Sequence, residues 1–170
     1  MLDLEAKTNP FDSLVEFIRQ ITNPGKGEID KVGDAVRLGF QANFSNESSG
    51  YGHKWTALAP KTQAVRKKLG FASQHPILVR TGSYRASFVQ RGAPNHIEEL
   101  TTTGDGWQLV TGSRDPRGDI LNNGGYTIID GYRVFVPARP VDGLSGPAQE
   151  RVRSTIGFIL EETRARTLGR

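Results

Sequence analysis

The segment HPILVRTGSYRASF, residues 75–88, joins two halves of the chain whose residue patterns differ. Its apolar run 77–79 predicts a core segment, with Leu78 as one of its anchors. Thr81 is suited to cap a short helical turn, Gly82 marks a tight point, and Phe88 is expected to lead into a first strand. We therefore interpret this segment as a structural joint between an N-terminal helical half and a C-terminal half that contains a sheet.

The N-terminal half has the spacing of amphipathic helices. Residues 11–21 place apolar side chains at i, i+3, i+4 and i+7, which predicts one helix. A second helix is expected over about residues 28–44. Glycine destabilises a helix interior, so the internal Gly33 and Gly39 indicate that this helix packs closely against another element.

A loop and a basic helix are predicted between this second helix and the joint. SNESSGYGHK, residues 45–54, is rich in Ser, Gly and Asn and predicts a flexible loop. Trp55 and Leu58 then have the character of core anchors. Pro60 suits the first turn of a helix that ends at Gly70 and is strongly basic near its end.

The C-terminal half has the alternation and turn residues of antiparallel strands. Strand character appears at residues 87–91, 96–102 and 107–112, and the TGDG sequence suits a hairpin between the last two segments. A second hairpin is predicted around the DG pair of YTIIDGYRVFVPAR, residues 126–139, with Pro137 as an anchor after its second strand. A short helix with a glycine stop is expected between the two hairpins, and an amphipathic helix should close the chain from about residue 146.

These elements predict an α+β domain with N-terminal helices, a small antiparallel sheet that includes two hairpins, and a C-terminal helix packed on the sheet. A length of 170 residues fits one domain over residues 1–170 and can bury a core. Residues 1–10 are expected to form a flexible N-terminal arm. The longest apolar runs are far below the roughly 20 residues that span a bilayer, so we expect a soluble, cytosolic product without a membrane contact.

The sequence favours a protein that is not an enzyme and holds neither a metal nor a cofactor. It has no cysteine, which excludes thiolate metal sites and cysteine nucleophiles. His53, His75 and His96 are far apart, so a metal site would have to be assembled by folding alone. Ser83 and Tyr84 lack the neighbouring residues of a hydrolase elbow or a strand-transfer site. Asp115 and Asp119 are four positions apart and flank a proline and a glycine, which favours a role in a turn and in helix capping over acid-base chemistry.

Basic residues supply the candidate contact surface of this chain, whose net charge is +4. A simpler interpretation is that the lysine and arginine side chains near the C-terminal end of a helix interact favourably with the helix dipole and stay solvated. Arg139 has a directional argument, because Pro137 and Pro140 hold the chain extended around it and such a fixed arginine suits an ion pair within the fold or across an interface. The candidates for subunit-interface or DNA-channel contacts are Arg66, Lys67, Lys68, Arg80, Arg85 and Arg139.

The order of the motifs resembles the phage virion-morphogenesis family, which includes the tail-completion proteins of Mu-like and P2-like phages. The matching residues are Trp55 and Leu58, then Thr62, Arg66 and Lys67, then Ile77, Leu78, Thr81, Gly82 and Ser87, and finally Pro137, Ala138 and Arg139. The resemblance covers roughly residues 28–165.

This resemblance implies a structural virion protein. It implies a ring, expected to hold six subunits, at the head-proximal end of the tail. The ring would bridge tail-tube or tail-terminator proteins and the head connector or head-closure protein, and would leave a channel for passing DNA. Residues 45–54 and the hairpin tip around Asp130 and Gly131 are the parts we expect to reach other subunits, unless they are only exposed loops.

Three alternatives remain open at this stage. The chain could be a tail terminator or a head-closure protein of the same region. It could be a DNA-binding module that uses the basic residues 66–68. It could also be a small hydrolase or nuclease whose site forms only on folding.

Overall fold

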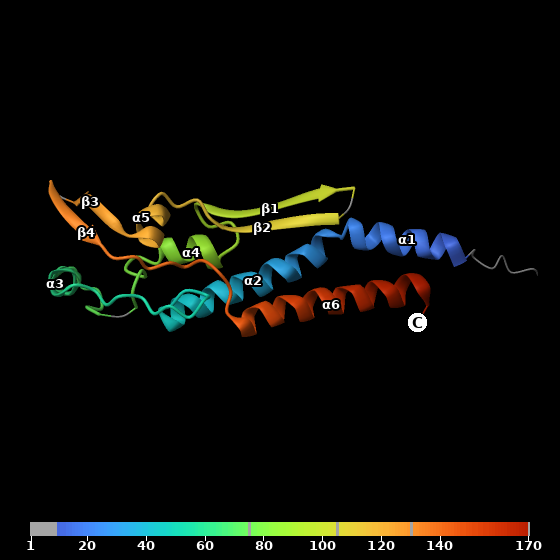
Figure 1. The fold of residues 1–170 in the computed structure, drawn as a ribbon, viewed down its shortest axis with the longest axis horizontal. Helices are drawn as coiled ribbons and strands as arrows, with labels where there is room; N and C mark the ends of the chain where they lie inside the picture. Colours follow the sequence, from blue (N-terminus) through green and yellow to red (C-terminus); the bar gives the residue numbers. More distant parts are fainter. Residues whose placement is uncertain (1–9, 75, 105, 130, 170) are drawn as a thin grey trace, which may run out of the picture.

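The computed structural model describes residues 10–74, 76–104, 106–129 and 131–169, and its α+β class is the one that the sequence predicts. The expected N-terminal arm lies outside this range except for Pro10, which begins the first helix. Figure 1 shows an elongated molecule in which the long helices lie under the β1–β2 hairpin and the β3–β4 hairpin lies at the opposite end from α1. The elements in chain order are α1 (Pro10–Thr22), α2 (Lys26–Asn46), α3 (Pro60–Lys68), α4 (Ser83–Val89), β1 (His96–Thr103), β2 (Gly106–Ser113), α5 (Gly118–Asn123), β3 (Gly125–Ile129), β4 (Tyr132–Val136) and α6 (Gly146–Leu168).

The long helices form one layer in which α6 runs antiparallel to α1 and α2 (Figure 1). Ser145 caps α6 by accepting a hydrogen bond from the backbone N–H of Ala148 at 3.4 Å, and Gly169 ends the helix in a left-handed conformation. A Cβ atom on Gly39 would lie only 2.5 Å from Leu144, next to the start of α6. The prediction that the glycines of α2 mark close packing is therefore confirmed at this position.

An aromatic core connects α2 to the shorter elements. Phe44 is 2% exposed and meets Trp55, Tyr84 and Phe88 at ring-centroid distances of 5.6, 6.2 and 5.9 Å. Edge-on and tilted ring pairs of this kind add to the gain from burial. The predicted anchor Trp55 is confirmed, and Leu58 and Leu78 are partly buried against the same cluster.

Residues 87–91 do not form the expected strand, because most of this segment belongs to helix α4. Tyr84, Ser87 and Phe88 are buried at i, i+3 and i+4, which is helical spacing and brings all three toward the core. Phe88 is thus a helical core residue, and its predicted place at a strand entry was wrong. Gly82, with φ +78°, is the N-cap of this helix and confirms the tight point, whereas Thr81 does not cap it and hydrogen-bonds the Ser83 hydroxyl at 3.1 Å.

Both predicted hairpins are present, but within the described residues they form separate two-stranded sheets. β1 pairs with β2 from His96 opposite Ser113 to Thr103 opposite Gly106. β3 pairs with β4 from Gly125 opposite Val136 to Ile129 opposite Tyr132. Helix α6 packs on α1 and α2, so the closing helix completes the helical layer beneath the β1–β2 hairpin.

Residues 45–54 differ from the open loop that the composition predicts. Helix α2 continues to Asn46, and Ser48 and Ser49 after it are buried. The N–H of Gly50 donates to the carbonyl of Asp142 at 3.0 Å, and the side chain of Asn43 donates to two carbonyls of the same segment, including that of Val141 at 2.9 Å. Ser48 and Ser49 are buried with local hydrogen-bond partners, whereas Gly50 and Asn43 hold this turn against a segment 92 or more positions away, which composition cannot reveal.

Candidate functional site

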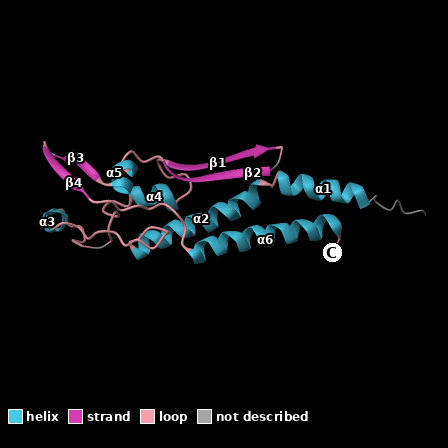
Figure 2. Cartoon of the chain, in the orientation of Figure 1, coloured by secondary structure: helices cyan, strands magenta, loops and turns pink. Residues whose placement is uncertain are grey.

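Four arginines line one pocket, which we call the arginine pocket. Its volume is about 290 Å³, and it lies among α3, α4, α5 and the segment after β4, where Figure 2 shows that loops connect short helices. Its polar lining also includes the hydroxyl groups of two threonines and one tyrosine, and four leucine or valine side chains form the rest of the wall. The lining residues are Arg66, Arg80, Arg117, Arg139, Thr62, Thr81, Tyr84, Leu58, Val65, Leu78 and Leu121.

Arg139 is fixed inside the fold. It is 5% exposed, and its Nε and Nη2 donate to the carbonyls of Thr56 at 2.8 Å and Ala57 at 3.2 Å. Burial lowers the pKa of its guanidinium group. The sequence correctly gave this side chain a fixed direction, but its described partners are backbone carbonyls. Arg139 therefore acts within the fold, one of the two roles expected for it, although through carbonyl groups and not through an ion pair, and its burial contradicts the other expected role as an accessible interface or DNA contact.

Arg66 is also buried, contrary to its predicted place on a solvated basic surface. Its Nη2 donates to the carbonyl of Pro76 at 3.1 Å, which ties α3 to the segment before Ile77. Its Nε is buried and has no hydrogen-bond partner among the described residues. Lys67 and Lys68, the next two residues of α3, are exposed and retain the predicted basic surface.

Arg80 lines the arginine pocket, whereas Arg85 does not. Arg80 is exposed and has its guanidinium carbon 5.8 Å from the ring centroid of Phe71. Arg85 is half-buried on α4, and its Nε has no hydrogen-bond partner in the described parts of the chain. The six candidate residues therefore do not form one exposed patch, although Arg66, Arg80 and Arg139 meet at the pocket.

Arg117 is the pocket residue that the sequence interpretation missed. Asp115 accepts hydrogen bonds from the backbone N–H of Arg117 at 3.0 Å and from its Nε at 2.8 Å, which confirms the predicted turn role of this aspartate. These bonds lower the pKa of Asp115. Arg117 also donates to the Ser83 hydroxyl at 3.0 Å, which joins α5 to α4. The DPRG turn is the signal that marks this arginine, since the turn fixes its backbone.

Tyr84 forms the buried floor of this region. It is 3% exposed, and its hydroxyl has no hydrogen-bond partner in the ranges that the structure describes. Burial, together with the charge of Asp115, raises the pKa of Tyr84 to about 12. The guanidinium carbon of Arg117 lies 5.5 Å from the centroid of the Tyr84 ring. The tyrosine is therefore a neutral, buried hydroxyl beside a cation.

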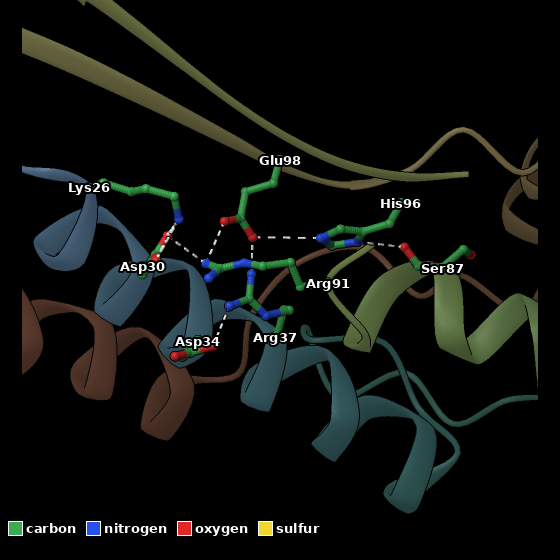
Figure 3. Close-up of polar contacts among 8 residues, drawn as sticks. All are labelled: Lys26, Asp30, Asp34, Arg37, Ser87, Arg91, His96 and Glu98. Atoms are coloured by element: carbon green, nitrogen blue, oxygen red, sulfur yellow. Dashed lines mark hydrogen bonds and ion pairs between the residues drawn. The ribbon is translucent and has the colours of Figure 1, made fainter. Parts of the chain in front are cut away.

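A second polar cluster attaches the first hairpin to the helices (Figure 3). Glu98 of β1 pairs with Arg37 of α2, and it also accepts a hydrogen bond from Arg91 at 2.6 Å. Arg91 in turn contacts Asp30 at 2.9 Å. His96 lies with Nδ1 2.9 Å from the carbonyl of Ser87 and Nε2 3.6 Å from Glu98. Since this cluster is composed of matched charges, it suits a structural clamp.

The second hairpin carries an exposed apolar face. Tyr126 lies opposite Phe135 and Ile128 lies opposite Arg133, so these four side chains share one face of the two-stranded sheet. Tyr126, Ile128 and Phe135 are exposed by 63%, 73% and 58%, respectively. Arg133 stacks on Tyr126, with its guanidinium carbon 4.3 Å from the ring centroid. The face is ordered by its own contacts and is open to a partner.

Comparisons of the chain with protein-family models, curated proteins and solved structures found no match. In the described residues there is no group of three or more potential metal ligands, and His75 lies outside that range. None of the described helices has both the length and the apolar character needed to cross a bilayer. The features of the described chain that bear on function are therefore the arginine pocket and the exposed face of the β3–β4 hairpin.

Proposed function

We propose that this chain is a non-enzymatic structural protein of a phage neck or head-proximal tail end, where its copies form a ring around the DNA channel. The observation that carries this proposal is the exposed apolar face of the β3–β4 hairpin. A two-stranded sheet is marginally stable by itself, so an ordered hairpin with open aromatic residues is expected to be covered in an assembly. The order of sequence motifs supports the choice of a virion protein.

A second exposed apolar surface, on α1, could contact the hairpin face of a neighbouring copy. Leu14, Val15 and Ile18 of α1 are exposed by 45%, 64% and 48%. Figure 1 shows α1 and the β3–β4 hairpin at opposite ends of the elongated molecule. Contact between unlike surfaces of successive copies is heterologous and closes into a ring when the rotation permits. We therefore propose that the hairpin of one copy packs on α1 of the next.

The remaining faces would meet the proteins on either side of the ring. In this proposal, tail-tube or tail-terminator proteins lie on one side and the head connector or head-closure protein lies on the other. A role as the tail terminator or the head-closure protein itself would use the same ring contact. These roles would be distinguished by which purified neighbour the ring binds.

Native mass spectrometry of the full chain tests the ring. We expect a closed oligomer, with six copies as the number implied by the family resemblance. Replacing both Tyr126 and Phe135 with Ser should abolish the oligomer, because both side chains are largely exposed, and circular dichroism checks that the dissociated chain stays folded. Phe158→Ser is the matched control, since Phe158 of α6 is exposed by 57% and belongs to neither proposed surface.

Three results would contradict the ring proposal. A wild-type chain that stays monomeric at high concentration and binds no purified tail or connector would exclude it. Loss of the oligomer in the control but not in the hairpin variant would place the contact elsewhere. A folded hairpin variant that keeps the wild-type oligomer would exclude the hairpin as the ring contact.

A nucleic-acid-binding module is the second candidate function, because Lys67 and Lys68 are exposed at the end of α3. In that case, the isolated monomer should bind duplex DNA with sub-micromolar affinity and a steep dependence on salt. Replacing both lysines with Gln should then weaken binding at all DNA sequences alike. Weak binding with a shallow salt slope would favour the assembly role.

A further inference from the structure

We propose that the arginine pocket binds a carboxylate side chain that lies between apolar residues in a segment of a partner protein. This site is separate from the β3–β4 hairpin on which the ring proposal depends. It is formed within one chain, so its binding can be measured whether or not the ring exists. Charge, unpartnered polar atoms and apolar walls support the proposal independently.

The first observation is the excess of positive charge. Four arginines line the pocket and no carboxylate does. Asp115 lies behind Arg117 and offsets that one guanidinium through contacts of 2.5 to 2.8 Å. The described residues provide no carboxylate partner for Arg66, Arg80 or Arg139. An anionic ligand would offset their charge in a partly desolvated site, where ion pairs are stronger than in water.

The second observation is a pair of buried polar atoms without partners. The hydroxyl of Tyr84 and the Nε of Arg66 are both buried and have no hydrogen-bond acceptor among the described residues. Such atoms usually have partners, because leaving a buried donor unpaired costs free energy. Both are donors, and a carboxylate has two acceptor oxygens. Both side chains line the same pocket, and because the two atoms are closed off from solvent, a bound carboxylate would reach them after a small rotation of these side chains.

The third observation is the shape and character of the walls, which favour a protein segment over nucleic acid. Arg66 and Arg139 are each 5% exposed, and Leu58, Val65, Leu78 and Leu121 surround them. A volume of about 290 Å³ accommodates one or two side chains. Duplex DNA presents a row of phosphates to exposed cations on a surface. An acidic side chain with apolar neighbours fits the combination of buried charge and leucine walls.

Fluorescence anisotropy with short labelled peptides tests this inference on the full chain. The probe is Gly-Leu-Glu-Leu-Gly, and the matched probes are Gly-Leu-Gln-Leu-Gly, which lacks the charge, and Gly-Ser-Glu-Ser-Gly, which lacks the apolar neighbours. We expect the first peptide to bind about 10-fold more tightly than either matched peptide, the ratio that corresponds to one charged hydrogen bond or one buried apolar group. Equal binding of the three peptides would overturn the proposal.

Two substitutions locate the binding in the pocket. Arg80→Gln removes an exposed cation from the pocket and should weaken binding of the Glu peptide about 5- to 10-fold. Tyr84→Phe removes only the hydroxyl and should weaken binding several-fold, while the urea midpoint stays the same or rises because an unpartnered buried donor is lost. Lys67→Gln is the control, because Lys67 is exposed on α3 outside the pocket, and it should leave peptide binding unchanged. Equal effects of the Arg80 and Lys67 substitutions would indicate general charge attraction and overturn the proposal.

Competition separates the protein ligand from other anions. Inorganic phosphate and a duplex of about 20 base pairs are added to the labelled Glu peptide at constant ionic strength. We expect phosphate to compete only at much higher concentration than the unlabelled peptide, because it makes no contact with the apolar walls. Displacement by phosphate at the peptide's own concentration would indicate a simple anion site. Tighter binding of the duplex with the same dependence on Arg80 would assign the pocket to nucleic acid, and either result would refute a protein ligand.

Discussion

Replacing Glu98 with Gln should destabilise the fold far more than the same change at the next residue. Glu98 lies in β1, its side chain is 15% exposed, and it pairs with the buried Arg37 of α2 as well as with Arg91 at 2.6 Å (Figure 3). The change to Gln keeps the size of the side chain and removes its charge. Among the described residues, the carboxylate that then still pairs with Arg37 is that of Asp34, whose side chain is 66% exposed.

The expected magnitude follows from the burial of Arg37. Removing one partner of a fully buried ion pair costs about 3 to 5 kcal/mol, because the other charge is left without compensation. Here Asp34 still contacts Arg37, and the amide oxygen of the substituted side chain can still accept a hydrogen bond, so we expect a loss of about 2 to 3 kcal/mol. In a chain of this length, that loss lowers Tm by roughly 4 to 12 °C.

The matched control is Glu99→Gln on the opposite face of the same strand. Glu99 pairs with Arg114, and both side chains are more than half exposed, at 53% and 68%. An exposed pair of this kind contributes about 0 to 1 kcal/mol, so the control should change stability little. Urea unfolding followed by circular dichroism gives the free energy of unfolding for each variant.

A double-mutant cycle with Arg37→Met tests the cause of the loss. If the cost of Glu98→Gln comes from the uncompensated Arg37 charge, the double variant should be more stable than the sum of the two single changes by about 1 to 3 kcal/mol. Equal losses at Glu98 and Glu99 would refute this reasoning. Simple additivity in the cycle would show that Glu98 acts through some other contact.

Three other changes test single contacts of the fold, and urea midpoints measure each of them. Gly50→Ala should lower the free energy of unfolding by at least about 2 kcal/mol, because the new Cβ would overlap the backbone of the 142–144 segment. The control Gly157→Ala should raise it by about 0.5 to 1 kcal/mol, because nothing lies within 4 Å of that position in α6. Equal effects of the two changes would contradict the buried turn. Burial raises the pKa of Tyr84 from 10.0 to about 12, so the tyrosine of the unfolded chain ionises first as the pH rises above 10. Between pH 10 and 12 the wild type should therefore lose about 2 to 3 kcal/mol of unfolding free energy relative to Tyr84→Phe, and parallel pH curves would exclude a buried neutral hydroxyl. Arg139→Lys should cost about 1 to 3 kcal/mol in the monomer, because lysine cannot reproduce the two bonds to Thr56 and Ala57, and an unchanged midpoint would restore the interface role first expected for this residue.

The hairpins and long helices could be predicted because their signals are local. The DG pair between alternating residues predicts the β3–β4 hairpin, which the structure contains. The periodic apolar residues predict α1, α2 and α6 to within a few residues. The segment at residues 87–91 was assigned wrongly, because a short apolar run has no clear period and the core contacts of α4 decide between helix and strand.

The candidate site could be predicted only in part. The sequence identified Arg66, Arg80 and Arg139 as candidate contact residues, and these three line one pocket. It placed Arg66 on a basic surface and left Arg139 either within the fold or at an interface, and the structure buries both beside backbone carbonyls. Arg117 was missed because its importance depends on Tyr84, which is 33 positions away and lies beneath it.

The sequence by itself determined the α+β class, the order of the long helices and hairpins, and the tight turn at Gly82. These features depend on backbone preferences and on periodicity within a few residues, so the local sequence is sufficient to predict them. Only the tertiary structure decided that Arg37 and Glu98 pair, that Arg139 is internal and that four arginines meet at one pocket. Arg37 and Arg139 have hydrogen-bond partners that lie 61 or more positions away in the sequence. The free energy of a charged side chain is set by its burial and by the groups that surround it after folding, so local sequence cannot predict these contacts.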